Sequence, residues 1–371
     1  MSINRLSSSS KTGMATRIIT GIVLMGVFVP CIVFGNWAFF IFMVFLSVVG
    51  IWEIVKAPGQ NRYDLLTILV VYLFVLSFIF WTFLKNFLTY GSFFRDDYFY
   101  LSDIFVSITG IIVYALVLFL IAITTPKVTL SDVTYLFTIG IVFTLGMQGM
   151  FFLRYFPNSS GIVNFTPTSE LNPHTMITAS YGESVSLGNY FTSWFHHFGL
   201  SQKFNSCLLF FFMLIGTWGS DVGAYFIGLF FGKHRMNPRI SPHKTWEGFF
   251  GGMVISIAAS LGFAAICEYC FHSPLVPGVI QFSYSEVLEK LGVLGGTAWP
   301  FIVILAVLMP VVGNVGGFLF SLVKRQYGIK DYGKIFPGHG GVIDRFDSIM
   351  INSIVMSIVV LLTANAWRFT V

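Results

Sequence analysis

The sequence predicts an all-α fold, a polytopic integral membrane bundle of about nine transmembrane helices. Of the 371 residues, 56% are hydrophobic and only 10% are charged, and the mean hydropathy is +0.81. Apolar runs of about 20 residues recur along the whole chain, and a helix of that length crosses a hydrocarbon core of roughly 30 Å. Lys and Arg are confined to the short segments between these runs, which is typical of membrane proteins and not of soluble domains.

Nine apolar runs define the predicted spans. In chain order they cover residues 18–34, 37–55, 65–84, 104–123, 133–153, 206–231, 249–271, 299–322 and 349–369. The first run follows a polar, Ser-rich start and leads directly into the second, so we interpret it as a transmembrane helix and not as a signal peptide. An odd number of spans places the two termini on opposite sides of the membrane.

The basic residues set the predicted orientation. If the N-terminus is cytoplasmic, fifteen Lys and Arg residues lie on the inner side and six on the outer side, which satisfies the positive-inside rule. The two most basic segments, 232–248 and 323–348, then share the cytoplasmic face, and the long segment 154–205 is an external loop. Because topology accounts for the net charge of +5, we expect no nucleic-acid partner.

A carboxylate interrupts the sixth apolar run. Asp221 lies about ten residues before the cytoplasmic end, or roughly 15 Å deep at the helical rise. A charge at this depth is costly, faces the bundle interior or a wet cavity, and is a functional-site hypothesis by default. The alternative is that Asp221 lies on a helix-packing face, has its hydrogen bonds made within the bundle and has no functional role. Four glycines in this run are spaced to let another helix approach closely, namely Gly219, Gly223, Gly228 and Gly232.

The segment 232–248 combines cations with a helix start. Its basic residues are Lys233, Arg235, Arg239 and Lys244. Thr245 is placed to cap the helix that follows, and Glu247 lies in the first turn of that helix. A helix N-terminus beside Lys244 is suited to bind an anion, whereas topology alone accounts for Arg235.

The segment 321–348 holds the densest group of charged residues. Its cations are Lys324, Arg325, Lys330, Lys334 and Arg345, and its carboxylates are Asp331, Asp344 and Asp347. Asp344, Asp347 and Ser348 share one face at the start of the ninth helix. Carboxylates in such a place suit Mg²⁺, which takes few protein ligands and completes its shell with water and phosphate oxygens. His339, among glycines, has three candidate roles: contacting phosphate, moving a proton or shaping the turn.

Two blocks of these residues resemble the phosphatidate cytidylyltransferases, the CDP-diacylglycerol synthases. The first block reads Asp221-x-Gly-Ala-Tyr225, Gly232-Lys233-His234 and Ser241-Pro242-x-Lys244-Thr245-x-Glu247-Gly248. The second reads Ser321-x-x-Lys324-Arg325, Lys330-Asp331-x-Gly333, Pro337-Gly338-His339-Gly340-Gly341 and Asp344-Arg345-x-Asp347-Ser348. The resemblance covers roughly residues 207 to 360, and the first five spans are similar to the family only in hydropathy and in the basic start before Ile18.

The resemblance implies a magnesium-dependent transfer of the cytidylyl group of CTP to phosphatidic acid, which releases pyrophosphate and forms CDP-diacylglycerol for phospholipid biosynthesis. The catalytic residues that it implies are Asp221, Lys244, Lys324, Arg325, Asp331, His339, Asp344 and Arg345. The substrate-binding residues are Lys233, Ser241, Ser321, Lys330, Gly340 and Gly341. The metal ligands are Asp344, Asp347, Asp331 and Asp221.

The same interpretation divides the chain into N-terminal transmembrane helices with an external loop (1–205) and a catalytic transmembrane region with two cytoplasmic motif loops (206–371). We expect an integral protein of a bacterial plasma membrane, or of the endoplasmic reticulum membrane if the source is eukaryotic, with the active site on the cytoplasmic side. Membrane lipid is an expected partner, and a homodimer is the assembly considered.

One position departs from the family pattern. Many bacterial members carry an acidic residue four positions before the motif serine, where this chain has Gly317. The residue that completes the metal shell is therefore open. Two other functions stay open as well: a related CTP-dependent polyprenol kinase or other lipid cytidylyltransferase, and a membrane transporter that uses Asp221 in its pathway.

Overall fold

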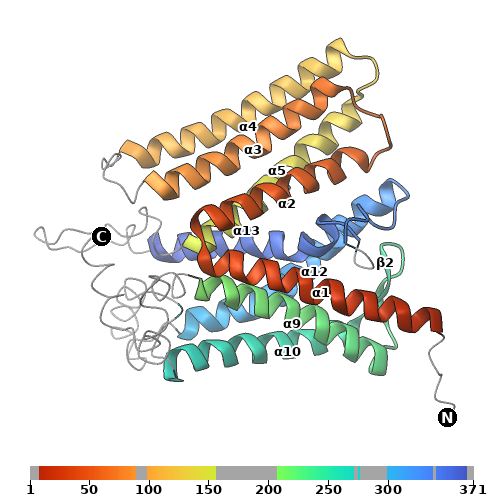
Figure 1. The fold of residues 1–371 in the computed structure, drawn as a ribbon, viewed down its shortest axis with the longest axis vertical. Coiled ribbons are helices and arrows are strands. Elements are labelled where there is room, and N and C mark those ends of the chain that lie inside the picture. Colours follow the sequence, from red (N-terminus) through yellow and green to blue (C-terminus); the bar gives the residue numbers. More distant parts are fainter. Residues whose placement is uncertain are drawn as a thin grey trace, which may run out of the picture.

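The computed structural model describes residues 8–88, 98–155, 207–270, 275, 299–336 and 340–365. Within these residues the chain forms long, roughly aligned helices and one short hairpin (Figure 1). The α-helices are α1 (Ser8–Phe34), α2 (Asn36–Lys56), α3 (Leu65–Leu88), α4 (Tyr98–Thr124), α5 (Leu130–Tyr155), α9 (Leu208–Phe231), α10 (Trp246–Ala265), α12 (Trp299–Gln326) and α13 (Ile343–Asn365). A short π-helix, η2 (Ile266–Cys270), continues α10.

As far as the structure describes them, the nine predicted spans are each covered by a helix, which confirms the all-α membrane fold and the predicted element order. Among the described residues, six helices are long and apolar enough to cross a membrane: Trp37–Lys56, Leu65–Phe83, Leu130–Arg154, Leu208–Phe231, Trp246–Tyr269 and Trp299–Gln326. Thr20–Phe34 and Ile108–Thr124 are shorter apolar helices. The last helix, α13, begins with charged residues instead.

Helix α13 lies at the junction of two groups of helices. It packs against α5 on one side and against α9 and α12 on the other, while α10 packs against α9 and α12. Helices α2, α3 and α4 pack around α5, and α1 packs against α2. One continuous hydrophobic core runs through both groups. The division of the chain at residue 205 stays a prediction.

The closest helix pair is α9 with α10, as the glycine spacing predicts. Gly223 of α9 faces Gly252 of α10, and a Cβ at Gly252 would lie 2.6 Å from the backbone oxygen of Ser220. At the end of α9, Gly228 faces the hydroxyl of Thr245. Absence of side chains at these positions lets the two backbones approach, which is how membrane helices gain packing energy without a hydrophobic driving force between them.

The two motif segments lie at the same end of the bundle. This end, on the right in Figure 1, contains the start of α1, the α2–α3 and α4–α5 connections, the hairpin and the segment that follows α12. The shared placement agrees with the topology expected from the basic residues, and it brings segments about 80 residues apart in sequence into one region.

The hairpin is an addition to the all-α prediction. Strands β1 (Arg235–Asn237) and β2 (Ser241–Thr245) pair antiparallel, with Arg235 opposite Thr245 and Asn237 opposite Ser241. The signal for the reversal is Asn237-Pro238, a dipeptide typical of turns. Because the hairpin fixes β2 against the start of α10, Lys244 and Thr245 hold set positions.

We expect Gly252→Ala to lower the unfolding temperature of the detergent-solubilised protein, because the added methyl overpacks the α9–α10 contact at a cost of about 1–3 kcal/mol. Gly262→Ala, on the same helix, is the matched control, since a Cβ there meets nothing within 4 Å. The control substitution should leave stability unchanged or raise it by up to about 1 kcal/mol through helix propensity. Equal effects of the two substitutions would contradict the close-packing account.

Candidate active site

The N-terminus of α13 is capped by a carboxylate from a distant part of the chain. Glu53 of α2 is buried, and its Oε1 and Oε2 accept hydrogen bonds from the backbone N–H groups of Val342 (3.0 Å) and Ile343 (2.9 Å). The first N–H groups of a helix have no partner within the helix, and a negative charge there also favours the positive end of the helix dipole. Glu53 therefore fixes where α13 begins and ties α2 to the second motif segment.

Two motif glycines make room for this carboxylate. A Cβ at Gly333 or at Gly341 would collide with Oε1 of Glu53. Gly340 has φ +87°, a left-handed conformation that glycine adopts without strain. Gly340 and Gly341 were expected to bind substrate, which stays a prediction; in the structure they lie against the carboxylates of Asp344 and Glu53 respectively.

Asp344, in the first turn of α13, anchors the loop that precedes the helix. Its Oδ1 accepts a hydrogen bond from Lys324 Nζ at 2.9 Å, and its Oδ2 accepts hydrogen bonds from the N–H groups of Tyr332 (2.8 Å) and Gly341 (3.0 Å). The Lys324 and Asp344 side chains are only 12% and 4% exposed, so this is a buried ion pair. Three donors therefore bind the Asp344 carboxylate, and through them Asp344 holds the loop before α13 in place.

Tyr332 completes this anchor. Its hydroxyl donates a hydrogen bond to the backbone oxygen of Phe320 at 3.1 Å, and its ring lies beside the Lys324 ammonium. Burial raises the pKa of the Tyr332 phenol, so the hydroxyl stays protonated and remains a donor. The loop after α12 is thereby held to α12 and α13 at once.

A second group of residues surrounds Lys244 of β2. The Lys244 Nζ donates a hydrogen bond to Oδ1 of Asn314 at 2.9 Å and lies 4.6 Å from the centre of the Phe318 ring. A Cβ at Gly317 would lie 2.9 Å from the same Nζ. The position where relatives carry an acid thus faces Lys244, and glycine leaves space for the ammonium. Burial is the main cause that lowers the pKa of Lys244, because desolvation disfavours the charged form.

Two further carboxylates belong to this group. Asp347 Oδ1 accepts a hydrogen bond from the N–H group of Ser348 at 2.6 Å. The charged neighbours of Asp347 are Lys324, Lys244 and Asp344, and those of Asp221 are Asp347, Lys244 and Arg345. The Asp221 and Arg345 side chains are exposed. A Cβ at Gly317 would meet both Lys244 Nζ of the first motif segment and Ser348 Oγ of the second, so residues of the two segments border one space there. A part in metal binding stays a prediction for Asp221 and Asp347.

Two other residues from the motif segments, Arg325 and Thr245, fix the hairpin and the start of α10. Arg325 donates hydrogen bonds to the backbone oxygens of Ile240 (3.1 Å) and Ile329 (3.4 Å), which fastens the hairpin to the end of α12. The predicted cap of α10 is confirmed, since the Thr245 hydroxyl accepts a hydrogen bond from Gly248 N–H at 3.1 Å.

Glu247, in the first turn of α10, holds the chain that leaves α9. It accepts hydrogen bonds from the N–H groups of Lys233 (3.1 Å) and His234 (3.2 Å). The Lys233 side chain itself is exposed, and Ser241 and Ser321 are half-buried. A part in substrate binding stays a prediction for these three residues.

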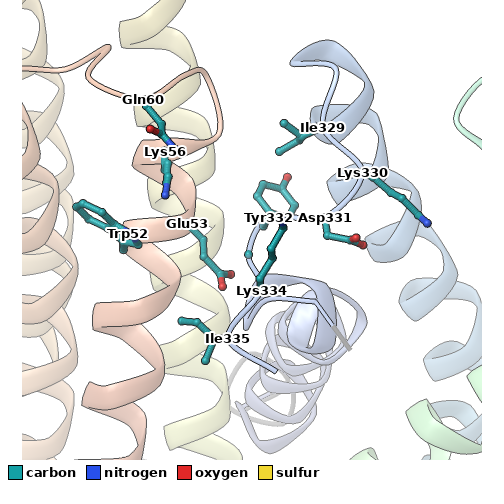
Figure 2. Close-up of a pocket in the computed structure, with 11 residues that line it drawn as sticks. Trp52, Glu53, Lys56, Gln60, Ile329, Lys330, Asp331, Tyr332, Lys334 and Ile335 are labelled. Atoms are coloured by element: carbon teal, nitrogen blue, oxygen red, sulfur yellow. The ribbon is translucent and has the colours of Figure 1, made fainter. Parts of the chain in front are cut away.

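Lys330 and Asp331 line a different pocket, which lies between α2 and the loop after α12 and has a volume of about 610 Å³ (Figure 2). Within the described part of the chain, no three His, Cys, Asp or Glu side chains are grouped as a metal site. The expected set of four aspartate ligands therefore stays a prediction, and one of them, Asp344, already accepts hydrogen bonds from Lys324 and from two backbone amides. His339 lies outside the described residues.

Glu53 and Asn314 are among the site residues that the sequence interpretation missed. The signal for Glu53 was present, because it is a lone carboxylate within a predicted membrane span, as is Asp221. Asn314 carried no comparable signal, since a single amide within an apolar helix is common. Their roles depend on contacts between residues that are far apart in sequence.

We expect Lys324→Met to destabilise the protein by about 3 kcal/mol or more, because it leaves the buried Asp344 carboxylate without its counter-ion. Lys127→Met is the matched control, since Lys127 pairs with Asp64 at 3.4 Å on the surface, with side chains 69% and 46% exposed. An exposed pair contributes about 1 kcal/mol or less. Thermal unfolding in detergent measures both, and similar losses would contradict the structural role of the Lys324–Asp344 pair.

Comparisons with known proteins agree with the resemblance in the motifs. The model of a cytidylyltransferase family matches residues 15–363. A protein of Staphylococcus epidermidis named phosphatidate cytidylyltransferase is 38% identical over 143 residues, which are 38% of this chain and 44% of the relative. Proteins of the same name from Bacillus subtilis (33% over 153 residues; 41% and 45%) and Mycobacterium bovis (37% over 152 residues; 41% and 41%) are also similar. The match spans less than half of each relative's length, whereas the family model spans nearly all of this chain. The chain therefore belongs to the cytidylyltransferase family.

Proposed function

We propose that this protein transfers the cytidylyl group of CTP to phosphatidic acid, forming CDP-diacylglycerol and pyrophosphate. The observation that carries the proposal is the space beside Gly317, which Lys244 Nζ of the first motif segment and Ser348 Oγ of the second both border. Asp221 and Asp347 are charged neighbours of Lys244, and Arg345 is a charged neighbour of Asp221. Family membership and the name shared by the relatives support the same activity.

The charges of this group suit a reaction between two anions. A phosphate oxygen of the lipid must approach the α-phosphorus of CTP, so the negative charge of both reactants has to be offset. Lys244 would contact phosphate oxygens, because its ammonium is partly desolvated and is directed by Asn314. Arg345 is exposed at the start of α13 and would hold the pyrophosphate leaving group. Such a site acts by positioning and charge stabilisation.

The donor set also fits magnesium. Asp221 and Asp347 are the carboxylates that would hold Mg²⁺, because Mg²⁺ needs only one or two protein carboxylates together with water and substrate phosphate oxygens. Asp344 stands beside them with its oxygens taken by Lys324 and backbone amides. When bound, the metal would neutralise charge on the triphosphate and polarise the α-phosphate.

The site lies where a water-soluble substrate and a membrane lipid could both reach it. The end of the bundle that holds both motif segments is the cytoplasmic end under the positive-inside rule. CTP would arrive there from water, while the acyl chains of phosphatidic acid stay in the bilayer. A bacterial plasma membrane, or the endoplasmic reticulum membrane in a eukaryote, is the proposed location, and a homodimer the proposed assembly.

Incubation of the purified protein in detergent with radiolabelled CTP, phosphatidic acid and Mg²⁺ tests the activity. We expect a lipid-soluble cytidine product together with pyrophosphate. Free CDP with a newly phosphorylated polyprenol would identify a kinase instead. No labelled lipid product across a range of lipids and divalent metals would overturn the proposal.

Two aspartate variants separate chemistry from folding in this assay. Asp221→Asn should lower turnover by about 100-fold or more, a typical loss for a group that stabilises transition-state charge, and should leave thermal stability near that of the wild type. Asp344→Asn should lower both turnover and stability, because it weakens the anchor of the loop after α12. Full activity of Asp221→Asn would remove Asp221 from the site.

A further inference from the structure

A pocket lined by both charged and apolar side chains lies beside the motif loop and is separate from the residues around Lys244. It has a volume of about 610 Å³, which is within the usual range for small-molecule sites. One wall is the C-terminal end of α2 with Trp52, Glu53 and Lys56, together with Gln60 of the α2–α3 connection. The other wall is the loop that includes Lys334 and Ile335 (Figure 2).

The charge balance of this pocket favours an anion. Its cations are Lys56 on one wall and Lys330 and Lys334 on the other. Neither Lys56 nor Lys334 has an ion-pair partner in the part of the chain that the structure describes. The negative charge of Glu53 is offset, because both of its oxygens accept hydrogen bonds at the N-terminus of α13. Lys330 and Asp331 point away from α2 in Figure 2.

The surroundings of the pocket favour a lipid over a soluble anion. Four large apolar residues of α2 precede Lys56 along one helical face, each at least 40% exposed: Ile41, Phe45, Val48 and Trp52. Their spacing of three and four residues makes one continuous stripe from the apolar middle of α2 to the pocket. Ile335, on the facing loop, is also exposed. Trp at the end of a membrane span followed by Lys one turn later is typical of the lipid–water interface.

We propose that this pocket binds the phosphate headgroup of an anionic glycerophospholipid. Lys56 and Lys334 contact the phosphate, Gln60 supplies a hydrogen bond to the headgroup, and the acyl chains lie along the stripe from Ile41 to Trp52. The lipid then contacts the loop whose other side is anchored by Asp344 through Tyr332 N–H. The site is separate from the Asp221 and Lys244 group, so it does not depend on cytidylyl transfer.

Native mass spectrometry of the full chain tests the proposal, with no CTP present. The protein is titrated in a non-ionic detergent with phosphatidylglycerol, with phosphatidylcholine of the same acyl chains, and with soluble glycerol phosphate. In the Lys56→Gln/Lys334→Gln variant, phosphatidylglycerol binding should weaken about 25-fold, since each lysine near the membrane surface contributes roughly fivefold. Phosphatidylcholine binding should not change.

Lys127→Gln is the matched control, because it removes one exposed lysine from the same end of the bundle without touching the pocket. It should keep phosphatidylglycerol binding within about twofold of the wild type, a small fraction of the effect expected for a pocket lysine. The single variants Lys56→Gln and Lys334→Gln, each checked by thermal unfolding, decide the matter if the double variant does not fold.

Three results would overturn the proposal. They are unchanged phosphatidylglycerol binding in the variants, equal weakening in Lys127→Gln, and displacement of phosphatidylglycerol by glycerol phosphate at the same concentration. The last result would make the pocket a site for soluble phosphate. Because binding is measured without turnover, failure here is distinct from failure of the proposed activity.

Discussion

The hydrogen bonds from Val342 and Ile343 to Glu53 are the contact on which the rest of the site depends. They join residues almost 290 positions apart, and they decide where α13 begins. Asp344 and Asp347 take their positions from that start. The same contact requires glycine at positions 333 and 341, since a side chain at either would occupy the place of the Glu53 carboxylate. A site that looks local in the sequence is therefore built on a helix from the N-terminal half of the chain.

The carboxylates near this end of the bundle divide into two kinds. Glu53 and Asp344 are surrounded by N–H donors and a lysine, and satisfied buried carboxylates of this kind organise backbone. Asp221 and Asp347 also have cationic neighbours, but their carboxylates accept fewer hydrogen bonds from backbone amides than those of Glu53 and Asp344. Position in the sequence does not distinguish the two kinds, since Asp344 and Asp347 are three residues apart. The partners decide which carboxylate is available for ligands.

Gly317 has a physical explanation in this arrangement. The position lies against Lys244, whose ammonium is held by Asn314 and Phe318. An acid there would pair with Lys244, whereas glycine leaves that lysine with Asn314 as its hydrogen-bond acceptor. Glycine at this position thus affects the charge of the site as well as the number of its possible ligands.

The sequence predicted the helices well and the loops poorly, for one reason. Apolar runs, the glycine spacing of α9 and the Thr245 cap depend on residues within a few turns of each other, and each of these predictions is confirmed. The hairpin, the Glu53 cap and the role of Asp344 as an anchor of the loop after α12 depend on contacts between distant segments. Helical periodicity says which residues share a face, but it does not say which helix that face meets. The aspartates could thus be placed at one end of the bundle, but not divided between anchor and open site.

Hydrogen–deuterium exchange at the amides of Val342 and Ile343 tests this account most directly. In the wild type these amides should be protected, and in Glu53→Ala they should exchange at least about tenfold faster, because a hydrogen bond to a charged acceptor contributes about 1.5–3 kcal/mol. Asp64→Ala, which removes an exposed carboxylate from the same end of the bundle, should leave them unchanged. Unaltered protection of both amides in Glu53→Ala would contradict the claim that α2 holds the start of α13.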